Sequence, residues 1–162
     1  MDAKYYLYKE SLNKFLTALN RASNTGILAN ALLATGGTAS QMKTTNAISY
    51  QIDGILASLA ATAAIPFTAT THDIAAGKER QFLVTVDASG TVAVVAGDEA
   101  DAGESVLPDV PSDVAVIGSI KILCNSETAF DATTTLLSNE GLTVTYTQGL
   151  LRDLDGVVGL IE

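Results

Sequence analysis

The fold is decided by residues 81–92, which read QFLVTVDASGTV. Asp87–Gly90 reverses the chain there, and Gly90 can adopt the left-handed backbone conformation that such loops need. Apolar residues take every second position on both sides of the reversal, a period typical of strands with one buried face. They are Phe82, Val84 and Val86 before the turn, and Val92 and Val94 after it. The segment therefore predicts an antiparallel β-hairpin.

Strand patterns lie on both sides of this hairpin. Residues 48–52 alternate in the same way and end at Asp53-Gly54, which predicts a tight turn. Residues 142–147 place Thr at every second position, where a branched β-carbon suits a pleated surface. Residues 114–123 are apolar on both parities, which predicts a strand buried on both faces. We expect a small antiparallel β-sandwich or barrel over about residues 44–147, so the fold class is mainly β.

The first part of the chain has a different period. Asp2 is a candidate N-cap, and apolar side chains recur every three or four residues, which predicts an amphipathic helix within residues 3–22. The apolar face consists of Tyr5, Tyr8, Leu12, Phe15 and Leu19, our candidate partner interface. This face either packs on its own domain or docks on a partner, and the residues alone leave both readings open. A second short helix is expected at residues 27–34, ended by Gly36-Gly37.

These periods divide the chain into three parts. We expect an N-terminal helical arm at residues 1–43, a β-domain at 44–148 and a C-terminal tail at 149–162. The tail holds seven Leu, Val and Ile residues, and an apolar terminus of this kind is normally held by its own domain or by another subunit. Residues 97–111 carry five acidic side chains and two prolines, which predicts a loop.

Charge restricts the classes of partner. Among 162 residues, 18 are acidic and 9 are basic, which gives a formal charge of −9 and argues against a nucleic-acid ligand. Only 17% of residues are charged, below the share of about 25% that is usual for soluble domains. A domain with so few charges is expected to cover part of its surface with other chains.

Membrane insertion and disulfide formation are not expected. The longest weakly polar stretch, residues 55–67, is too short to span a bilayer, and no signal peptide begins the chain. Cys124 is the single cysteine, so it can form no internal disulfide, and its apolar neighbours predict a small buried hydrophobic residue. The sequence therefore predicts folding in a reducing cytoplasm.

No motif predicts catalysis. His72 is the single histidine and is expected in a solvated loop, and the chain has neither a nucleophile elbow nor a phosphate-binding loop. Asp98, Glu99 and Asp101 could supply oxygens to calcium, but EF-hand spacing is missing and a solvated acidic loop is the simpler interpretation. We therefore expect no enzyme activity, no cofactor and no metal.

Four segments, taken in order, resemble a known group of proteins. They are residues 48–54, residues 82–92, the Leu107–Pro111 stretch that leads to 117–120, and residues 141–146. This order is similar to that in small virion proteins of tailed bacteriophages, of the capsid decoration (cement) and head-fibre kind. The resemblance covers about residues 44–147 and implies a non-enzymatic protein that binds the major capsid protein on the outer surface of the head. It also implies a homo-oligomer, for which we favour a trimer over a dimer, made in the host cytoplasm and located in the virion.

Two other functions were weighed against this one. A carbohydrate- or receptor-binding module of a fibre or tail would need exposed aromatic side chains, yet the chain has no Trp and an aromatic share of 6%. A small hydrolase that uses two carboxylates would need a recognisable pair, and nothing in the spacing of the acidic residues selects one.

Overall fold

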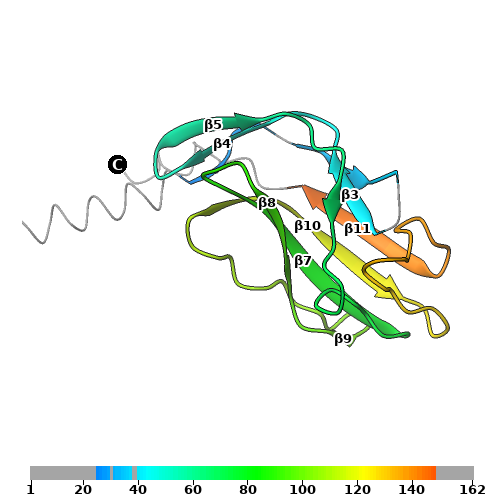
Figure 1. Cartoon of the computed structure of the whole chain (residues 1–162). Helices are drawn as coiled ribbons and strands as arrows, with labels where there is room; N and C mark the ends of the chain where they lie inside the picture. The colour runs from blue at the N-terminus through cyan, green and yellow to red at the C-terminus, as the bar shows by residue number, and fades with distance from the viewer. Residues whose placement is uncertain (1–24, 30, 38–39, 149–162) are drawn as a thin grey trace, which may run out of the picture.

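The computed structural model describes residues 25–29, 31–37 and 40–148 (Figure 1). The described part is mainly β, with several antiparallel sheets, no closed barrel and no helix. The predicted helix within residues 3–22 and the apolar tail at 149–162 lie outside the described residues. The prediction of a mainly β chain is confirmed, and the barrel alternative is not realised in the described part.

The largest sheet contains the hairpin that the sequence predicted. Its strands run in the order β11 (Leu142–Gln148), β10 (Val114–Cys124), β7 (Lys78–Asp87) and β8 (Val92–Ala96), and β9 (Ala100–Asp101) pairs with the start of β7. In the predicted turn, Gly90 has a φ of 84°. The Asp87 carboxylate accepts hydrogen bonds from the Ser89 and Thr91 amides at 2.8 and 2.9 Å, which closes the turn.

A β-bulge in β10 explains why this strand is apolar on both parities. Its pairing with β7 shifts between Val116 and Gly118, so Ile117 has no directly opposed residue. Inward-facing positions are therefore odd-numbered before the bulge and even-numbered after it. The side chains of the opposite face are half-buried, so the prediction of a strand buried on both faces is wrong. The bulge changes the parity of the buried face instead.

Two small sheets complete the fold. One has the order β1 (Gly26–Ile27), β4 (Ile48–Ile52) and β5 (Ile55–Leu59), and the other has the order β2 (Leu33–Thr35), β3 (Gln41–Thr44) and β6 (Ile65–Pro66). Asp53 and Gly54 both have positive φ, 52° and 84°, as a two-residue type I′ turn between β4 and β5 requires. The predicted alternation and turn at residues 48–54 are confirmed.

The short helix predicted at residues 27–34 is wrong. This segment supplies β1 and the start of β2, and its apolar residues Ile27, Ala31 and Leu33 are all buried in the core. β1 pairs with β4 and β2 pairs with β3, so pairing with distant strands overrides the local helical pattern. In the described part of the chain, β-structure therefore begins at Gly26 rather than near residue 44.

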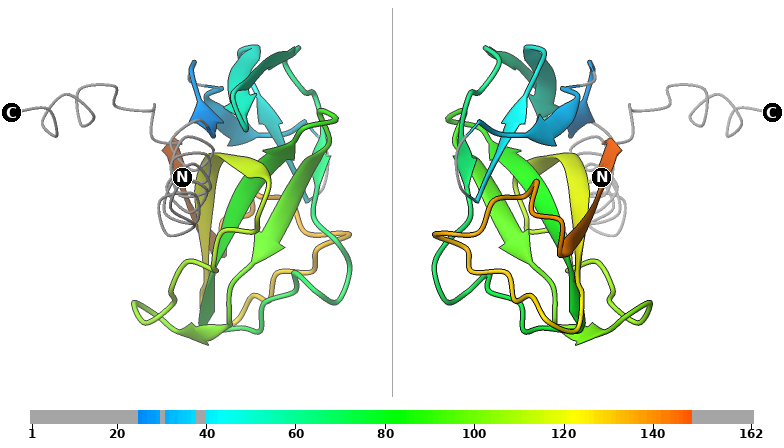
Figure 2. Two further views of the ribbon diagram at one scale, coloured as in Figure 1. Left: turned by 90° about the vertical axis from the view of Figure 1, so that its left-hand side faces the viewer. Right: turned by 90° about the vertical axis from the view of Figure 1, so that its right-hand side faces the viewer.

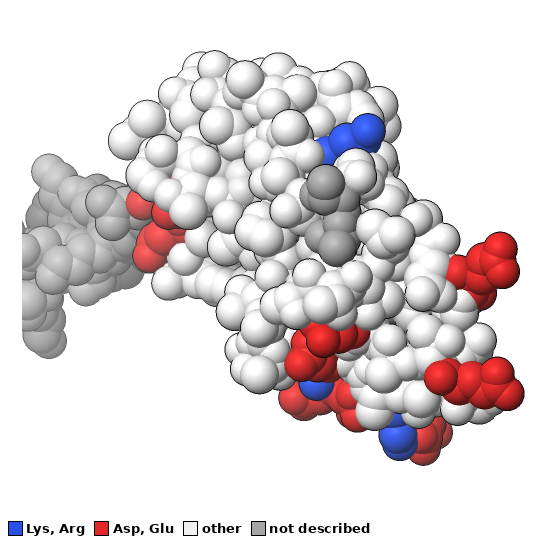
Figure 3. Space-filling view, turned by 45° about the vertical axis from the view of Figure 1, so that its right-hand side comes forward, with Lys and Arg blue, Asp and Glu red and all other residues white. Residues whose placement is uncertain are grey.

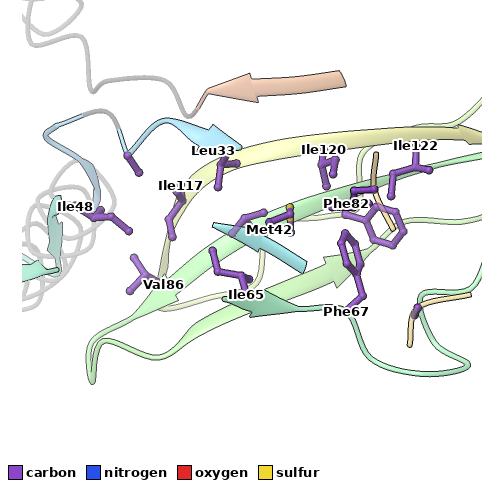
Figure 4. Close-up of a cluster of buried hydrophobic side chains, with 14 of the residues drawn as sticks. Leu33, Met42, Ile48, Ile65, Phe67, Phe82, Val86, Ile117, Ile120 and Ile122 are labelled. Atoms are coloured by element: carbon purple, nitrogen blue, oxygen red, sulfur yellow. The ribbon is translucent and has the colours of Figure 1, made fainter. Parts of the chain in front are cut away.

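The core lies between the three sheets. The small sheets cover one face of the main sheet (Figure 2). In the core cluster, Ile48 lies at one end beside Ile117 and Val86, Met42 and Ile65 lie in the middle, and Phe67 packs against Phe82 at the other end (Figure 4). Side chains also join β2 to the edge strand β11: the Gln148 amide group accepts from Leu33 N at 2.9 Å and donates to Leu33 O at 3.4 Å.

Candidate functional site

His72 is a buried core residue rather than the solvated loop histidine that the sequence predicted. Its side chain is 4% exposed and packs edge-on against Phe67 and Phe82, at centroid distances of 5.7 and 5.5 Å. Nδ1 accepts a hydrogen bond from Thr68 N at 2.8 Å. Burial first, and then the nearby Arg80 guanidinium, lower the pKa of His72, although Asp73 acts in the opposite direction. A neutral, enclosed imidazole with its acceptor atom occupied is a packing residue.

The acidic loop holds its carboxylates apart from one another. Asp101 forms an ion pair with Lys78 at 2.6 Å, and Glu99 accepts a hydrogen bond from Ala75 N at 2.8 Å. The Lys78 ammonium, by hydrogen bonding and by charge, lowers the pKa of Asp101. Among the described residues, no group of three or more His, Cys, Asp or Glu side chains is placed to hold a metal ion. The arrangement at Asp98, Glu99 and Asp101 therefore gives no support to calcium binding.

Glu79 is a buried carboxylate that the sequence did not single out. It is 2% exposed, accepts a hydrogen bond from the Ser105 hydroxyl, and lies 3.5 Å from Lys121 Nζ. Burial alone would raise the pKa of Glu79, but the Ser105 hydroxyl, the Lys121 ammonium and the Gly103 amide together hold it below its ordinary value. A carboxylate that stays ionised is a weak general base and no general acid. Glu79 instead anchors the acidic loop to the outer face of β7.

Cys124 is buried, as predicted. It is 2% exposed, and burial raises the pKa of its thiol. A protonated, enclosed thiol is a poor nucleophile. Cys124 and His72 are therefore enclosed by core residues, whereas Glu79 is buried on the outer face of β7, beneath the acidic loop.

The surface is strongly divided by charge. The described residues hold 4 basic and 13 acidic side chains, a net charge of −9. Figure 3 shows most of the visible acidic side chains over the lower part of the molecule and a second acidic group at the left, whereas the upper part, which holds the small sheets, carries one visible basic group. Residues 54–71 contain no charged side chain at all.

The end that holds the small sheets displays large apolar side chains. Ile55 and Leu56, at the start of β5, are 72% and 69% exposed, and Leu28 is 40% exposed. Leu28 and Leu56 line a shallow hollow of about 430 Å³ on the outer face of the β1-β4-β5 sheet. We call the three residues the apolar tip. Leu28 and Leu56 share the outer face of this sheet, whereas Ile55, which precedes Leu56 in β5, points to the opposite side, and Asp53 lies in the adjoining turn. Exposed apolar side chains that lie close together mark a contact surface better than single ones do.

A second apolar feature lies on the outer face of the main sheet. It is a groove of about 520 Å³ whose floor is formed by β10 and by Leu83 of β7. Leu107 and Val110 of the acidic loop line it, 48% and 56% exposed, and Thr25, Gly26, Thr147 and Gln148 line it as well. We call this feature the outer groove. The described chain thus begins and ends at its edge.

The sequence-predicted interface cannot be placed in this surface. Tyr5, Tyr8, Leu12, Phe15 and Leu19 lie outside the described residues.

The sequence patterns did not predict the apolar tip, although the absence of charged residues between Asp53 and Asp73 is a visible signal. In the described part of the chain, no helix has the length and apolar character to cross a membrane. The outer groove has no such signal, because its walls come from distant segments.

Comparison with known proteins found no match: no family model, no curated protein and no solved structure is similar to this chain at a significant level.

Proposed function

We propose that this chain is a non-enzymatic structural protein of a virus particle, which binds the outer surface of a phage capsid and stabilises it. In this proposal its partners are the major capsid protein and further copies of itself, with a trimer favoured over a dimer. The domain is then classed as an antiparallel β-sandwich, in which the two small sheets together form the second layer. The protein is made in the host cytoplasm and located on the capsid.

The apolar tip is the observation that carries the proposal. An isolated domain gains no stability from holding Ile55 and Leu56 about 70% exposed at the end of a hairpin whose single charged residue is Asp53. A shell protein gains from it, because subunits already placed by symmetry present the same contact many times at high effective concentration. The acidic end then faces solvent, where its charge keeps decorated particles apart.

The described aromatic side chains argue against the carbohydrate-binding alternative. Tyr50, Phe67, Phe82 and Phe130 are buried, and Tyr146 is half-buried with its hydroxyl bonded to Thr35 Oγ1 at 3.0 Å. In the described part of the chain, no exposed aromatic ring is therefore left to stack on a sugar. We keep the capsid role as the proposal.

The test is binding of the purified chain to heads of its own particle that were prepared without it. The Ile55→Asp, Leu56→Asp double variant should lose most of this binding. Full burial of a large aliphatic side chain is worth about 1.5–3 kcal/mol, and about 70% of each side chain is available for burial. The two changes together should cost about 2–4 kcal/mol, or roughly 30- to 1,000-fold in affinity.

Leu136→Asp is the matched control. Leu136 is also exposed, at 47%, but it lies in the loop between Asp131 and Glu140, away from the tip in sequence and among acidic residues. Its replacement should leave head binding unchanged. Co-sedimentation measures both variants, with far-UV circular dichroism to confirm that they fold. A wild-type chain that ignores the heads, or a tip variant that binds as tightly as wild type, contradicts the proposal.

A further inference from the structure

The outer groove has the composition of a binding site for an apolar helix face. Its lining residues are uncharged, and the floor contains Leu83, which is 4% exposed although it does not belong to the core cluster. One wall is held in place from beneath: Gln81 Nε2 donates to Ser105 O at 2.5 Å, and the Ser105 hydroxyl bonds to Glu79. Leu107 and Val110, which follow Ser105 in the same loop, are thereby kept beside the sheet.

Several acidic residues adjoin the lining residues of this groove in sequence or in strand pairing. Asp109 and Asp113 are neighbours in sequence of the lining residues Val110 and Val114. Asp87 is paired directly with Val114, and the Asp53 amide donates to Thr25 Oγ1 at 3.1 Å. No basic residue lines the groove. A complementary ligand is therefore apolar on one side and basic on its flanks.

One segment of this chain has that composition. Residues 1–24 carry Lys4, Lys9, Lys14 and Arg21 against Asp2 and Glu10, a net charge of +2, beside the predicted apolar face. Residues 149–162 are also apolar, but they carry one basic residue against three acidic ones, so an acidic rim would repel them. Charge complementarity thus selects the N-terminal segment.

The length of the connection favours the segment of another copy. The predicted helix ends near residue 22 and β1 begins at Gly26, which leaves three residues to reverse the chain. Thr25, the last of them, already bonds to Asp53. A connection this short resists folding back over the groove edge that it forms, and short hinges favour exchange of an arm between copies.

We propose that the outer groove of each copy binds residues 3–22 of a neighbouring copy, with Tyr5, Tyr8, Leu12, Phe15 and Leu19 against the groove. The proposal rests on the proposed homo-oligomer and names the contact that forms it. It concerns contacts between copies, whereas the apolar tip concerns the capsid. An experiment can therefore contradict the contact between copies without contradicting the contact with the capsid, and the reverse also holds.

The test uses two full-length variants that break opposite halves of the contact. Leu107→Asp with Val110→Asp damages the groove at exposed positions, and Leu12→Asp with Phe15→Asp damages the helix face. Val106→Asp is the matched control, because Val106 lies in the same loop, is 65% exposed and does not line the groove. Sedimentation velocity should show oligomers for wild type and the control, and a 16.7 kDa monomer for each double variant.

Mixing the two double variants separates exchange between copies from docking within one copy. Each mixed pair has one intact groove and one intact helix face, so an equimolar mixture should form a species of two chains and no larger one. A mixture that stays monomeric contradicts exchange between copies and overturns the proposal. A groove variant as oligomeric as wild type, or a wild type that is monomeric at every concentration, overturns it as well.

Lengthening the hinge provides an independent arm of the test. Six Gly and Ser residues inserted between Asn24 and Thr25 should let each segment reach its own groove, where its effective concentration is higher. The oligomer should then dissociate at concentrations at which wild type remains associated. An unchanged oligomer at the lowest measurable concentration contradicts the proposal. If wild type is monomeric but still binds heads, the proposed capsid role is supported and the exchange of residues 3–22 between copies is contradicted.

Discussion

Replacement of His72 should remove a pH-dependence of stability that this chain owes to a single residue. His72 is the one histidine of the sequence, so no other side chain has its ordinary pKa between about 5 and 7. Its Nδ1 faces the Thr68 amide at 2.8 Å. Protonation would place two N–H donors against each other in a site that is 4% exposed to solvent.

The sign follows from proton binding in the two states. The native pKa of His72 is lowered from 6.5, so below pH 6.5 the unfolded chain binds more protons than the native one. The stability that neutral His72 contributes is therefore complete above pH 6.5 and is lost as the pH falls from 6.5 towards the lowered native pKa. The slope cannot exceed about 1.4 kcal/mol per pH unit for one proton. Loss of a buried hydrogen bond of this kind costs about 1–3 kcal/mol, which sets the total change expected.

His72→Asn is the diagnostic variant. The Asn oxygen can replace Nδ1 as acceptor for Thr68 N–H, but it does not titrate. We expect the variant to be less stable than wild type at pH 7, because it loses ring contacts with Phe67 and Phe82, and to show no change between pH 7 and 5. Urea unfolding followed by far-UV circular dichroism at each pH gives both curves. An equal loss of unfolding free energy between pH 7 and 5 in wild type and in His72→Asn, or a native His72 pKa of 6.5 or higher by NMR, would refute this reasoning.

Three further predictions concern the fold. Gly90→Ala should destabilise by about 1–2 kcal/mol, because φ is 84° there, whereas Gly37→Ala, which meets no atom within 4 Å, should change the unfolding free energy by less than about 0.5 kcal/mol in the same urea titration. Ile122→Ala, at a fully buried position, should cost about 2–5 kcal/mol in thermal or urea unfolding, and a cost below 1 kcal/mol would mean that the core is misplaced. Ser105→Ala should raise the pKa of Glu79 and lower the free energy of unfolding by about 1–3 kcal/mol at pH 7. Because the native pKa of Glu79 would then be less depressed, the protein should lose less stability through Glu79 as the pH falls below about 4.5.

Local patterns in the sequence were enough to predict the strands that pair with a near neighbour. The alternation at residues 48–52 and 82–86, and the turns at Asp53-Gly54 and Gly90, depend on side-chain period and on the backbone freedom of one or two residues. The alternating strand β11 was predictable for the same reason. The surplus of acidic residues was visible as well, since charge requires no folding to be counted.

Tertiary contacts decided what local patterns predicted wrongly or missed. Residues 27–34 form strands because β4 and β3 supply their pairing partners, and His72 is buried because Phe67 and Phe82 enclose it. The outer groove exists because a loop, two sheets and both ends of the described chain meet at one face. Gln148 and Leu33, which bond to each other, are 115 residues apart in sequence. No local period encodes such a meeting, because its free energy is gained only when distant segments are packed together.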